Sequence, residues 1–279
     1  MPVLRDLEIG VMFWAGRNPV ETIRELKELG VRAGQLAIPG EMPLEGAAQE
    51  WKAALESEQF TVVTVFCAYS GESYADVPAV RQTVGFVPTS TRSEREDRTR
   101  EVSDFAAAIG VASIGCHIGF VAENEEDPEY IAVRDLVRRV CDYAGKHGQT
   151  FVLETGQETA EVLLKFLKDV ERPNIGINFD PANMIMYGTG DPIQALSVLA
   201  PQVISVHCKD GVWPPKNAVI TLGVEKPLGE GAVGMEQFIN KLKQVGYTGI
   251  LSIEREIEDR EQRMRDLRHG VELLERLRD

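Results

Sequence analysis

The chain has 279 residues, of which 43% are hydrophobic, so it is long enough for two ordinary domains or for one barrel of about 250 residues. Its formal net charge of −14 would repel nucleic-acid phosphates and anionic membranes, which argues against either partner. Four dispersed cysteines without a CxxC pair, and no apolar run of about 18 residues, predict a cytoplasmic protein with buried free thiols.

Short apolar segments alternate with amphipathic segments along the whole chain. Strands are expected near residues 9–14, 33–38, 61–69, 112–118, 150–154, 175–179, 203–208 and 250–253. Helices are expected near residues 19–29, 44–58, 93–109, 128–146, 158–170, 192–199, 235–245 and 259–277. Two connections, residues 70–91 and 210–234, are longer than ordinary βα loops and are expected to be irregular.

This alternation predicts a closed (β/α)8 TIM barrel, because the strands are apolar on both faces and no linker separates the units. Three joints repeat one pattern, in which Gly30, Gly110 or Gly246 ends a helix shortly before the next strand. An open doubly wound sheet is the alternative. That fold would predict a glycine-rich phosphate-binding turn after the first strand, and the segment FWAGRNP is not one.

Four successive strands end in a side chain that can bind a metal. These residues are Glu154, Asp180, His207 and Glu254. Since parallel strands of a barrel all open on one face, the four side chains are expected to line one arc of that face. Three carboxylates and one imidazole suit Mn²⁺, Mg²⁺ or Co²⁺, with Zn²⁺ as a further option. The alternative for any single acid is a solvated loop carboxylate.

Five other residues are candidates for substrate binding. Lys209 shares the orientation of His207 and could stabilise an oxyanion or move a proton, or else form a salt bridge. His117 is a hydroxyl or carbonyl contact or a structural histidine. Asn183 and Glu158 follow ligands closely enough to reach the same pocket, and Trp14 packs either on a sugar face or in the core.

The long connections also contain candidates for a phosphate clamp. Arg81, Arg92 and Lys216 are well placed in sequence for this role, although each is equally at home as a solvated loop charge. The sequence therefore leaves open whether the substrate is phosphorylated.

Such a metal site suits chemistry next to a carbonyl group. A metal that chelates a carbonyl oxygen and the adjacent hydroxyl acidifies the C–H between them and stabilises the enediolate. Glu154 and Glu254 could then act as base and acid on opposite faces of the substrate. Two-base transfer would give epimerisation, and one-base transfer between adjacent carbons would give aldose–ketose isomerisation.

The motifs LETGQE, FDPAN, VHCKD, LGEG and ILSIERE resemble the xylose isomerase-like TIM barrels of the sugar phosphate isomerase/epimerase group, which includes the ketose 3-epimerases. The resemblance implies one such domain over residues 1–279. It implies one divalent ion, Mn²⁺ first, bound by Glu154, Asp180, His207 and Glu254, with Glu154 and Glu254 as the catalytic pair. It also implies an isomerase of carbohydrate metabolism, acting on a sugar or sugar phosphate as a homodimer or homotetramer.

Two positions depart from the ketose 3-epimerases. Those enzymes carry a histidine three residues after the metal-binding aspartate and an arginine soon after the metal-binding histidine, where this chain has Asn183 and Lys209. Two alternatives therefore stay open beside an isomerase or epimerase. One is a dehydratase of the inosose type, acting on a keto-polyol, and the other is a non-catalytic sugar-binding barrel.

Overall fold

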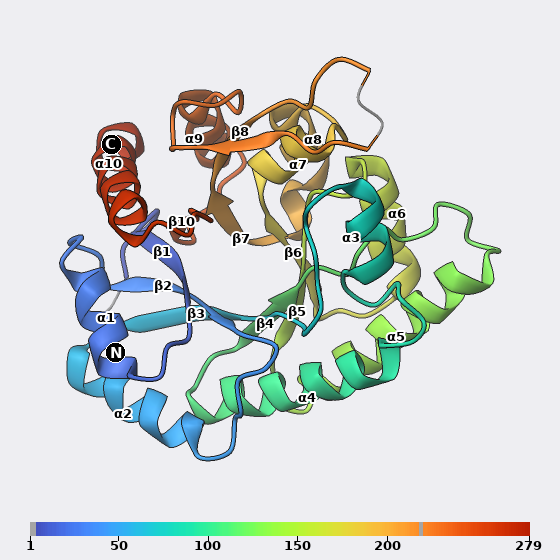
Figure 1. Ribbon diagram of the computed structural model, residues 1–279, viewed down its shortest axis with the longest axis horizontal. Coiled ribbons are helices and arrows are strands. Elements are labelled where there is room, and N and C mark those ends of the chain that lie inside the picture. Colours follow the sequence, from blue (N-terminus) through green and yellow to red (C-terminus); the bar gives the residue numbers. More distant parts are fainter. Residues whose placement is uncertain (1–3, 218–219) are drawn as a thin grey trace.

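A closed parallel barrel forms the centre of the computed structural model, which describes residues 4–217 and 220–279 (Figure 1). Around the barrel the strands follow the order β1-β10-β7-β6-β5-β4-β3-β2. Their bounds are β1 Ile9–Trp14, β2 Ala33–Ile38, β3 Thr61–Cys67, β4 Ser113–Cys116, β5 Thr150–Glu154, β6 Ile175–Phe179, β7 Val203–Cys208 and β10 Leu251–Ile253. The predicted (β/α)8 barrel is confirmed, and the open sheet is excluded.

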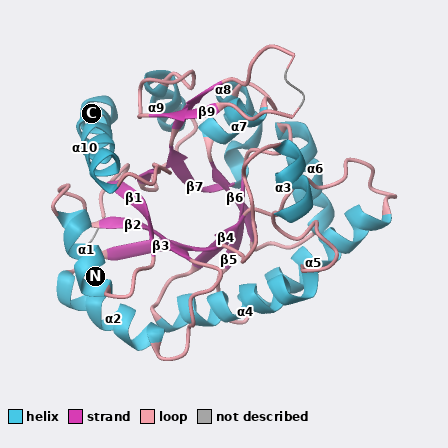
Figure 2. Cartoon of the chain, viewed as in Figure 1, coloured by secondary structure: helices cyan, strands magenta, loops and turns pink. Residues whose placement is uncertain are grey.

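Helices surround the strands as an outer ring (Figure 2). They are α1 Pro19–Lys27, α2 Ala47–Glu58, α4 Arg92–Ala108, α5 Pro128–Gly145, α6 Ala160–Val170, α8 Pro192–Leu199, α9 Met235–Gln244 and α10 Arg260–Arg278. Gly30, Gly110 and Gly246 have φ of 84°, 80° and 79°, the left-handed conformation expected where glycine follows a helix. In the described part of the chain, no helix is both long and apolar enough to cross a membrane.

The connections contain more regular structure than the sequence predicted. Helix α3 (Val77–Thr83) lies within residues 70–91, where Asp76 caps it by accepting a hydrogen bond from the Ala79 N–H at 2.8 Å. Strands β8 (Asp210–Val212) and β9 (Val224–Lys226) form an antiparallel hairpin in the second connection. Residues 1–3 and 218–219, which fall in the expected N-terminal segment and in that second connection, lie outside the described residues.

A short helix that was not predicted from the sequence follows β6. Helix α7 (Pro181–Tyr187) begins directly after Asp180, whose side chain is its N-cap. Asp followed by Pro is as good a start for a helix as for a turn, because Asp accepts the free N–H groups and Pro has no N–H to leave unpaired. The short helix matters for the site, since it fixes the orientation of the Asp180 carboxylate.

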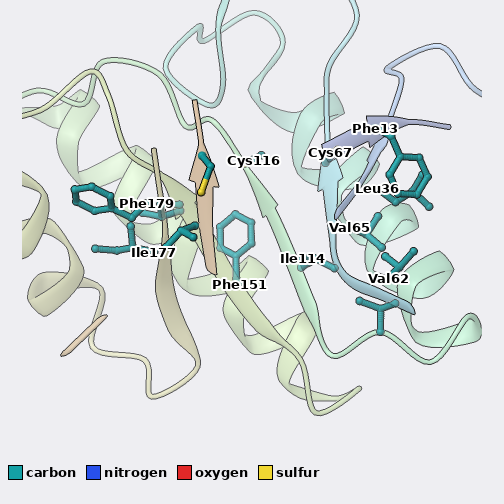
Figure 3. Close-up of a cluster of buried hydrophobic side chains, with 14 of the residues drawn as sticks. Phe13, Leu36, Val62, Val65, Cys67, Ile114, Cys116, Phe151, Ile177 and Phe179 are labelled. Carbon is teal, nitrogen blue, oxygen red and sulfur yellow. The ribbon is translucent and has the colours of Figure 1, made fainter. Parts of the chain in front are cut away.

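Apolar side chains fill two separate layers of the fold. The larger cluster lies between the strands and the outer helices and includes Phe151, Ile177 and Phe179 (Figure 3). A smaller cluster comprises Ala37, Phe66 and Val152, with Met12 packed against it. Phe66 faces the barrel interior, since its ring lies 5.3 Å from that of His207. The barrel interior is therefore apolar where these four side chains meet.

Candidate metal centre

The four predicted ligands converge at the C-terminal end of the barrel. One ligand atom from each of Glu154, Asp180, His207 and Glu254 lies within 4.8 Å of the others, and all four residues are buried. His207 Nδ1 lies 3.0 Å from Glu254 Oε2, 3.1 Å from Glu154 Oε1 and 3.6 Å from Asp180 Oδ2. The structure thus brings together side chains that are up to 100 residues apart in sequence, since Glu154 and Glu254 belong to one cluster.

Asp180 divides its two carboxylate oxygens between different tasks. Oδ1 accepts a hydrogen bond from the Asn183 N–H at 2.9 Å, which caps α7. Oδ2 is buried and has no hydrogen-bond partner among the described residues. The Thr155 hydroxyl also binds the Asp180 backbone, accepting from its N–H at 2.8 Å and donating to its carbonyl at 3.0 Å. One oxygen is therefore held free, facing the cluster.

A divalent cation fits this set of residues. Within the described chain, Asp180 Oδ2 is a buried carboxylate oxygen without a hydrogen bond, which is costly unless a cation binds there. Lys209 Nζ lies 3.1 Å from Glu254 Oε2 and forms an ion pair with it. Carboxylate oxygens with one imidazole nitrogen are ligands typical of hard and borderline divalent ions.

Burial and mutual charge shift the acidity of the cluster. Burial raises the pKa of Asp180 to about 6. Burial also disfavours the charged form of Glu254, but His207 and Lys209 outweigh it and hold the pKa of Glu254 well below its usual value. Burial likewise opposes charge on His207, yet Glu254 and Glu154 raise its pKa well above the usual value. A metal ion would therefore displace a proton from His207.

A cavity of about 890 Å³ opens above the cluster. Glu154 and Glu254 line this cavity, whereas Asp180 and His207 do not and are 0% exposed. The four ligands thus form two pairs. Asp180 and His207 are enclosed by protein, and the two glutamates face both the cluster and the space where a ligand would bind.

Four of the five predicted substrate contacts also line the cavity: Trp14, His117, Asn183 and Lys209. Trp14 is 45% exposed, so it is not a core residue. The other three contact the glutamates. His117 Nε2 lies 3.2 Å from Glu154 Oε2, Asn183 Nδ2 donates to Glu154 Oε1 at 3.1 Å, and Lys209 contacts Glu254.

Glu158 is not among the residues that line the cavity. Its Oε1 accepts a hydrogen bond from the Val121 N–H at 3.0 Å, which joins the start of α6 to the loop after β4. Burial raises the pKa of this carboxyl to about 7. In this structure Glu158 therefore stabilises a loop and does not reach into the cavity as the sequence suggested.

Several residues in or beside the cavity escaped prediction because their partners are distant in sequence. Gln157 Nε2 lies 3.1 Å from His117 Nδ1 and so positions the imidazole that contacts Glu154. Glu72 lines the cavity from the connection after β3, and Glu225 does so from β9. Glu256, which pairs with Lys209 at 2.6 Å, could have been found, because it stands two positions after Glu254.

The three basic residues considered for phosphate binding lie elsewhere. None of Arg81, Arg92 and Lys216 lines the cavity. The Arg81 guanidinium lies over the Phe120 ring, 4.9 Å from its centroid. Arg92 donates hydrogen bonds to two backbone carbonyls of its own loop, at 2.7 and 2.6 Å.

Comparison with known proteins identifies the family. The sequence profile of the xylose isomerase-like TIM barrels matches residues 23–277, so this chain belongs to that family. A xylose isomerase domain protein from Planctomyces limnophilus is 42% identical, with a TM-score of 0.93 over 98% of both chains. An uncharacterized protein from Methanocaldococcus jannaschii is 30% identical over 97 residues, which span 31% of its length.

More distant solved structures share the fold. A xylose isomerase-like TIM barrel protein from Mycobacterium smegmatis, in complex with magnesium, is 16% identical with a TM-score of 0.71 over 98% of both chains. A D-allulose 3-epimerase from Methylomonas sp. is 17% identical with a TM-score of 0.69 over 99% of both chains. At these identities the similarity establishes the barrel architecture alone.

Proposed function

We propose that this protein is a divalent-metal-dependent isomerase or epimerase, with Mn²⁺ as the preferred ion, that moves a proton next to the carbonyl of an uncharged sugar. The observation that carries the proposal is the division of the four ligands. Two glutamates from β5 and β10 reach the cavity, whereas the aspartate and the histidine are sealed beneath them. Similarity to a magnesium-bound barrel and to a sugar epimerase agrees with this assignment.

Both glutamates are suited to proton transfer. Burial opposes the charge on Glu154, but His117 and His207 hold its pKa below the usual value, and the pKa of Glu254 is lowered further. Each is therefore an ionised base at neutral pH. If one takes the proton from carbon, and the other first takes up a proton from solvent and delivers it to the opposite face of that carbon, the product is an epimer. If a single glutamate returns it to the adjacent carbon, the product is an aldose–ketose isomer.

The other cavity residues orient the substrate and the bases. His117 and Asn183 each hold one oxygen of Glu154, through contacts of 3.2 and 3.1 Å, which fixes the plane of that carboxylate. Lys209 Nζ stands beside Glu254 and can donate a hydrogen bond to a substrate oxygen. When bound, a divalent ion would polarise the substrate carbonyl and acidify the neighbouring C–H.

The charge of the cavity favours an uncharged substrate. Besides the two ligands, Glu41, Glu72, Glu225 and Glu256 line it. Among the described residues that line the cavity, Lys209 is the one lysine or arginine, and Glu254 and Glu256 already pair with it. These glutamates would therefore repel a substrate that carries a phosphate or a carboxylate. Exposed aromatic rings of Trp14 and Tyr74 offer apolar surfaces for a sugar face.

Solvent exchange tests the proposal. Purified protein loaded with Mn²⁺ is incubated in D₂O with a panel of free ketoses and their phosphate esters, and C–H exchange is followed by NMR. We expect exchange into one or more free ketoses and none into the phosphates. Glu254→Gln should slow exchange by about 10²- to 10⁴-fold, the usual contribution of a general acid or base.

Glu41→Gln is the matched control, because Glu41 lines the same cavity but is exposed and outside the cluster. It should exchange at nearly the wild-type rate. Loss of water from the substrate would instead indicate a dehydratase. Tight Mn²⁺ binding without exchange in any sugar would indicate a binding protein and overturn the assignment.

A further inference from the structure

Three neighbouring strands carry a second polar side chain below the metal ligands. Each of these residues stands two positions before a ligand, so both side chains of a pair face the barrel interior. The pairs are Asn178 on β6 with Asp180 just after that strand, Ser205 and His207 on β7, and Ser252 on β10 with Glu254 just after that strand. Interiors of such barrels are normally filled by branched apolar residues, so this polar layer calls for a physical reason.

The polar layer extends across the barrel. Gln35 Nε2 on β2 donates a hydrogen bond to Asn178 Oδ1 at 3.1 Å, although β2 and β6 lie on opposite sides of the barrel. The Ser205 hydroxyl donates to the same oxygen at 2.6 Å. Gln35 and Asn178 are both 0% exposed. These side chains therefore meet in the lumen and do not merely line one wall.

The same layer contains polar atoms that the protein does not satisfy. Among the described residues, Gln35 Oε1, Asn178 Nδ2 and Ser252 Oγ are buried without a hydrogen-bond partner. Each such atom costs about 1–3 kcal/mol if nothing binds it. One atom is an acceptor, one is a donor and one can be either. Water matches this mixture, whereas a cation would find too few acceptors.

His207 adds a fourth atom to this set. Its Nδ1 faces the three carboxylates, and its Nε2 is buried with no hydrogen-bond partner in the described chain. A metal-binding histidine almost always donates its second N–H to a carboxylate, a carbonyl or water. Ser252 is the register partner of His207 on the adjacent strand, so its hydroxyl lies beside the imidazole on the inner face.

A pocket at the opposite end of the barrel reaches the same layer. It has a volume of about 210 Å³ and is lined by Thr64, Ser113 and Ser205, together with the segments that precede β1 and β10. Ser205 thus faces this pocket and also binds Asn178. Ser205 is therefore the link between the N-terminal pocket and the polar layer.

We propose that the barrel interior beneath the metal centre is a water-binding site built by Gln35, Asn178 and Ser252, and that water bound there accepts the hydrogen bond of His207 Nε2. The site fixes the imidazole with Nδ1 toward the metal, which makes Ser252 a positioning residue. This role rests on the proposed metal centre, whereas the water site itself does not.

Crystallography of the metal-free and Mn²⁺-loaded protein tests the site directly. At about 1.5 Å resolution, both forms should show ordered water within hydrogen-bond distance of Ser252 Oγ and His207 Nε2. A dry layer, with Nε2 directed at the Phe66 ring, would overturn the proposal. Water in the layer without any Mn²⁺ uptake would refute the proposed function and not the water site.

Metal affinity tests the positioning role. Ser252→Ala should raise the Kd for Mn²⁺ about 10-fold, the usual effect of losing an outer hydrogen bond to a metal-binding histidine. The thermal midpoint of the metal-free variant should stay within about 2 °C of wild type, because the lost hydroxyl has no hydrogen-bond partner among the described residues. An unchanged Kd would overturn the positioning role.

Thr64→Val is the matched control for this measurement. It removes a hydroxyl from the same layer, but that hydroxyl pairs with Ser113 at 3.2 Å. Its Kd for Mn²⁺ should stay within about twofold of wild type, a difference below about 0.5 kcal/mol. An equal rise in Kd for both variants would show a general disturbance of the barrel and contradict the specific role of Ser252.

Discussion

The two halves of the barrel interior differ in chemistry although their backbones are alike. On one side, Met12, Ala37 and Phe66 from β1, β2 and β3 form an apolar cluster. On the other, β6, β7 and β10 carry buried polar residues that end in ligands. The first half contributes apolar burial to stability. The second half contains buried charged groups that destabilise the metal-free protein and are expected to bind the metal. Substitutions in the two halves should therefore change the stability of the metal-free protein in opposite directions.

Phe66→Ala should cause the largest loss of stability. The side chain is 4% exposed within the apolar cluster, and truncation of a buried phenylalanine costs about 3–5 kcal/mol. Urea denaturation of the metal-free protein measures this loss. Tyr74→Ala is the control, because that ring is 43% exposed and its removal should cost below about 1 kcal/mol. If both variants lost the same stability, the apolar half would not be the part of the barrel interior that contributes most to stability.

Asp180→Asn should instead increase the free energy of unfolding of the metal-free protein at pH 8. The folded-state pKa is about 6 against an ordinary 3.8, so the folded protein binds more protons between these values and loses stability as pH rises through them. Asparagine removes that cost and still caps α7, which predicts a gain of about 2 kcal/mol.

The gain should vanish near pH 4, where the carboxyl is protonated in the folded state. Urea denaturation at pH 8 and pH 4 measures it. With Mn²⁺ present, the order should reverse, because wild type alone keeps the full ligand set. A variant less stable than wild type at pH 8 without metal would show that the carboxylate is already well paired.

Much of the contrast between the two halves of the barrel could be predicted from the sequence. The strand bounds of β1, β2, β5, β6 and β7 were predicted to the residue, because buried parallel strands are unbroken apolar runs. The four candidate ligands, which the structure brings into one cluster, stood out in the sequence because each ends such a run. The polar layer was equally visible as a polar residue two positions before Asp180, His207 and Glu254, had the alternation been followed backwards as well as forwards.

Non-local contacts explain what the sequence could not provide. The Asp210 carboxylate on β8 holds the segment that follows β9, because it accepts hydrogen bonds from the N–H groups of Gly229 at 3.0 Å and Val233 at 3.1 Å. Gln157 contacts His117, which lies 40 residues earlier in the sequence. Glu158 looked like a pocket residue because it follows Glu154 closely, but Val121 holds it at a loop. No local pattern encodes these partners.

Glu158→Gln should cause a smaller change in stability, and that change should depend on pH. Burial raises the pKa of this carboxyl from 4.5 to about 7, so wild-type stability should fall as pH rises through that interval. The variant lacks this dependence and should be more stable at pH 8 by about 1 kcal/mol, after allowance for partial exposure. Thermal unfolding between pH 4 and pH 8 measures the slope.

Glu161→Gln serves as its control, because Glu161 is exposed in the first turn of α6, three residues after Glu158. It should keep the wild-type pH profile. If Glu158→Gln kept that profile as well, the carboxyl would be ionised without penalty, and its hydrogen bond from Val121 would fully offset burial.

Titration of Mn²⁺ into EDTA-treated protein, followed by calorimetry, tests the central claim most directly. Wild type should bind one ion per chain with a Kd in the micromolar range or below and should release protons as His207 loses its charge. Asp180→Asn and His207→Ala should weaken binding by at least about 100-fold. Wild type that takes up no Mn²⁺ at about 100 µM, or variants that bind as tightly as wild type, would contradict the account.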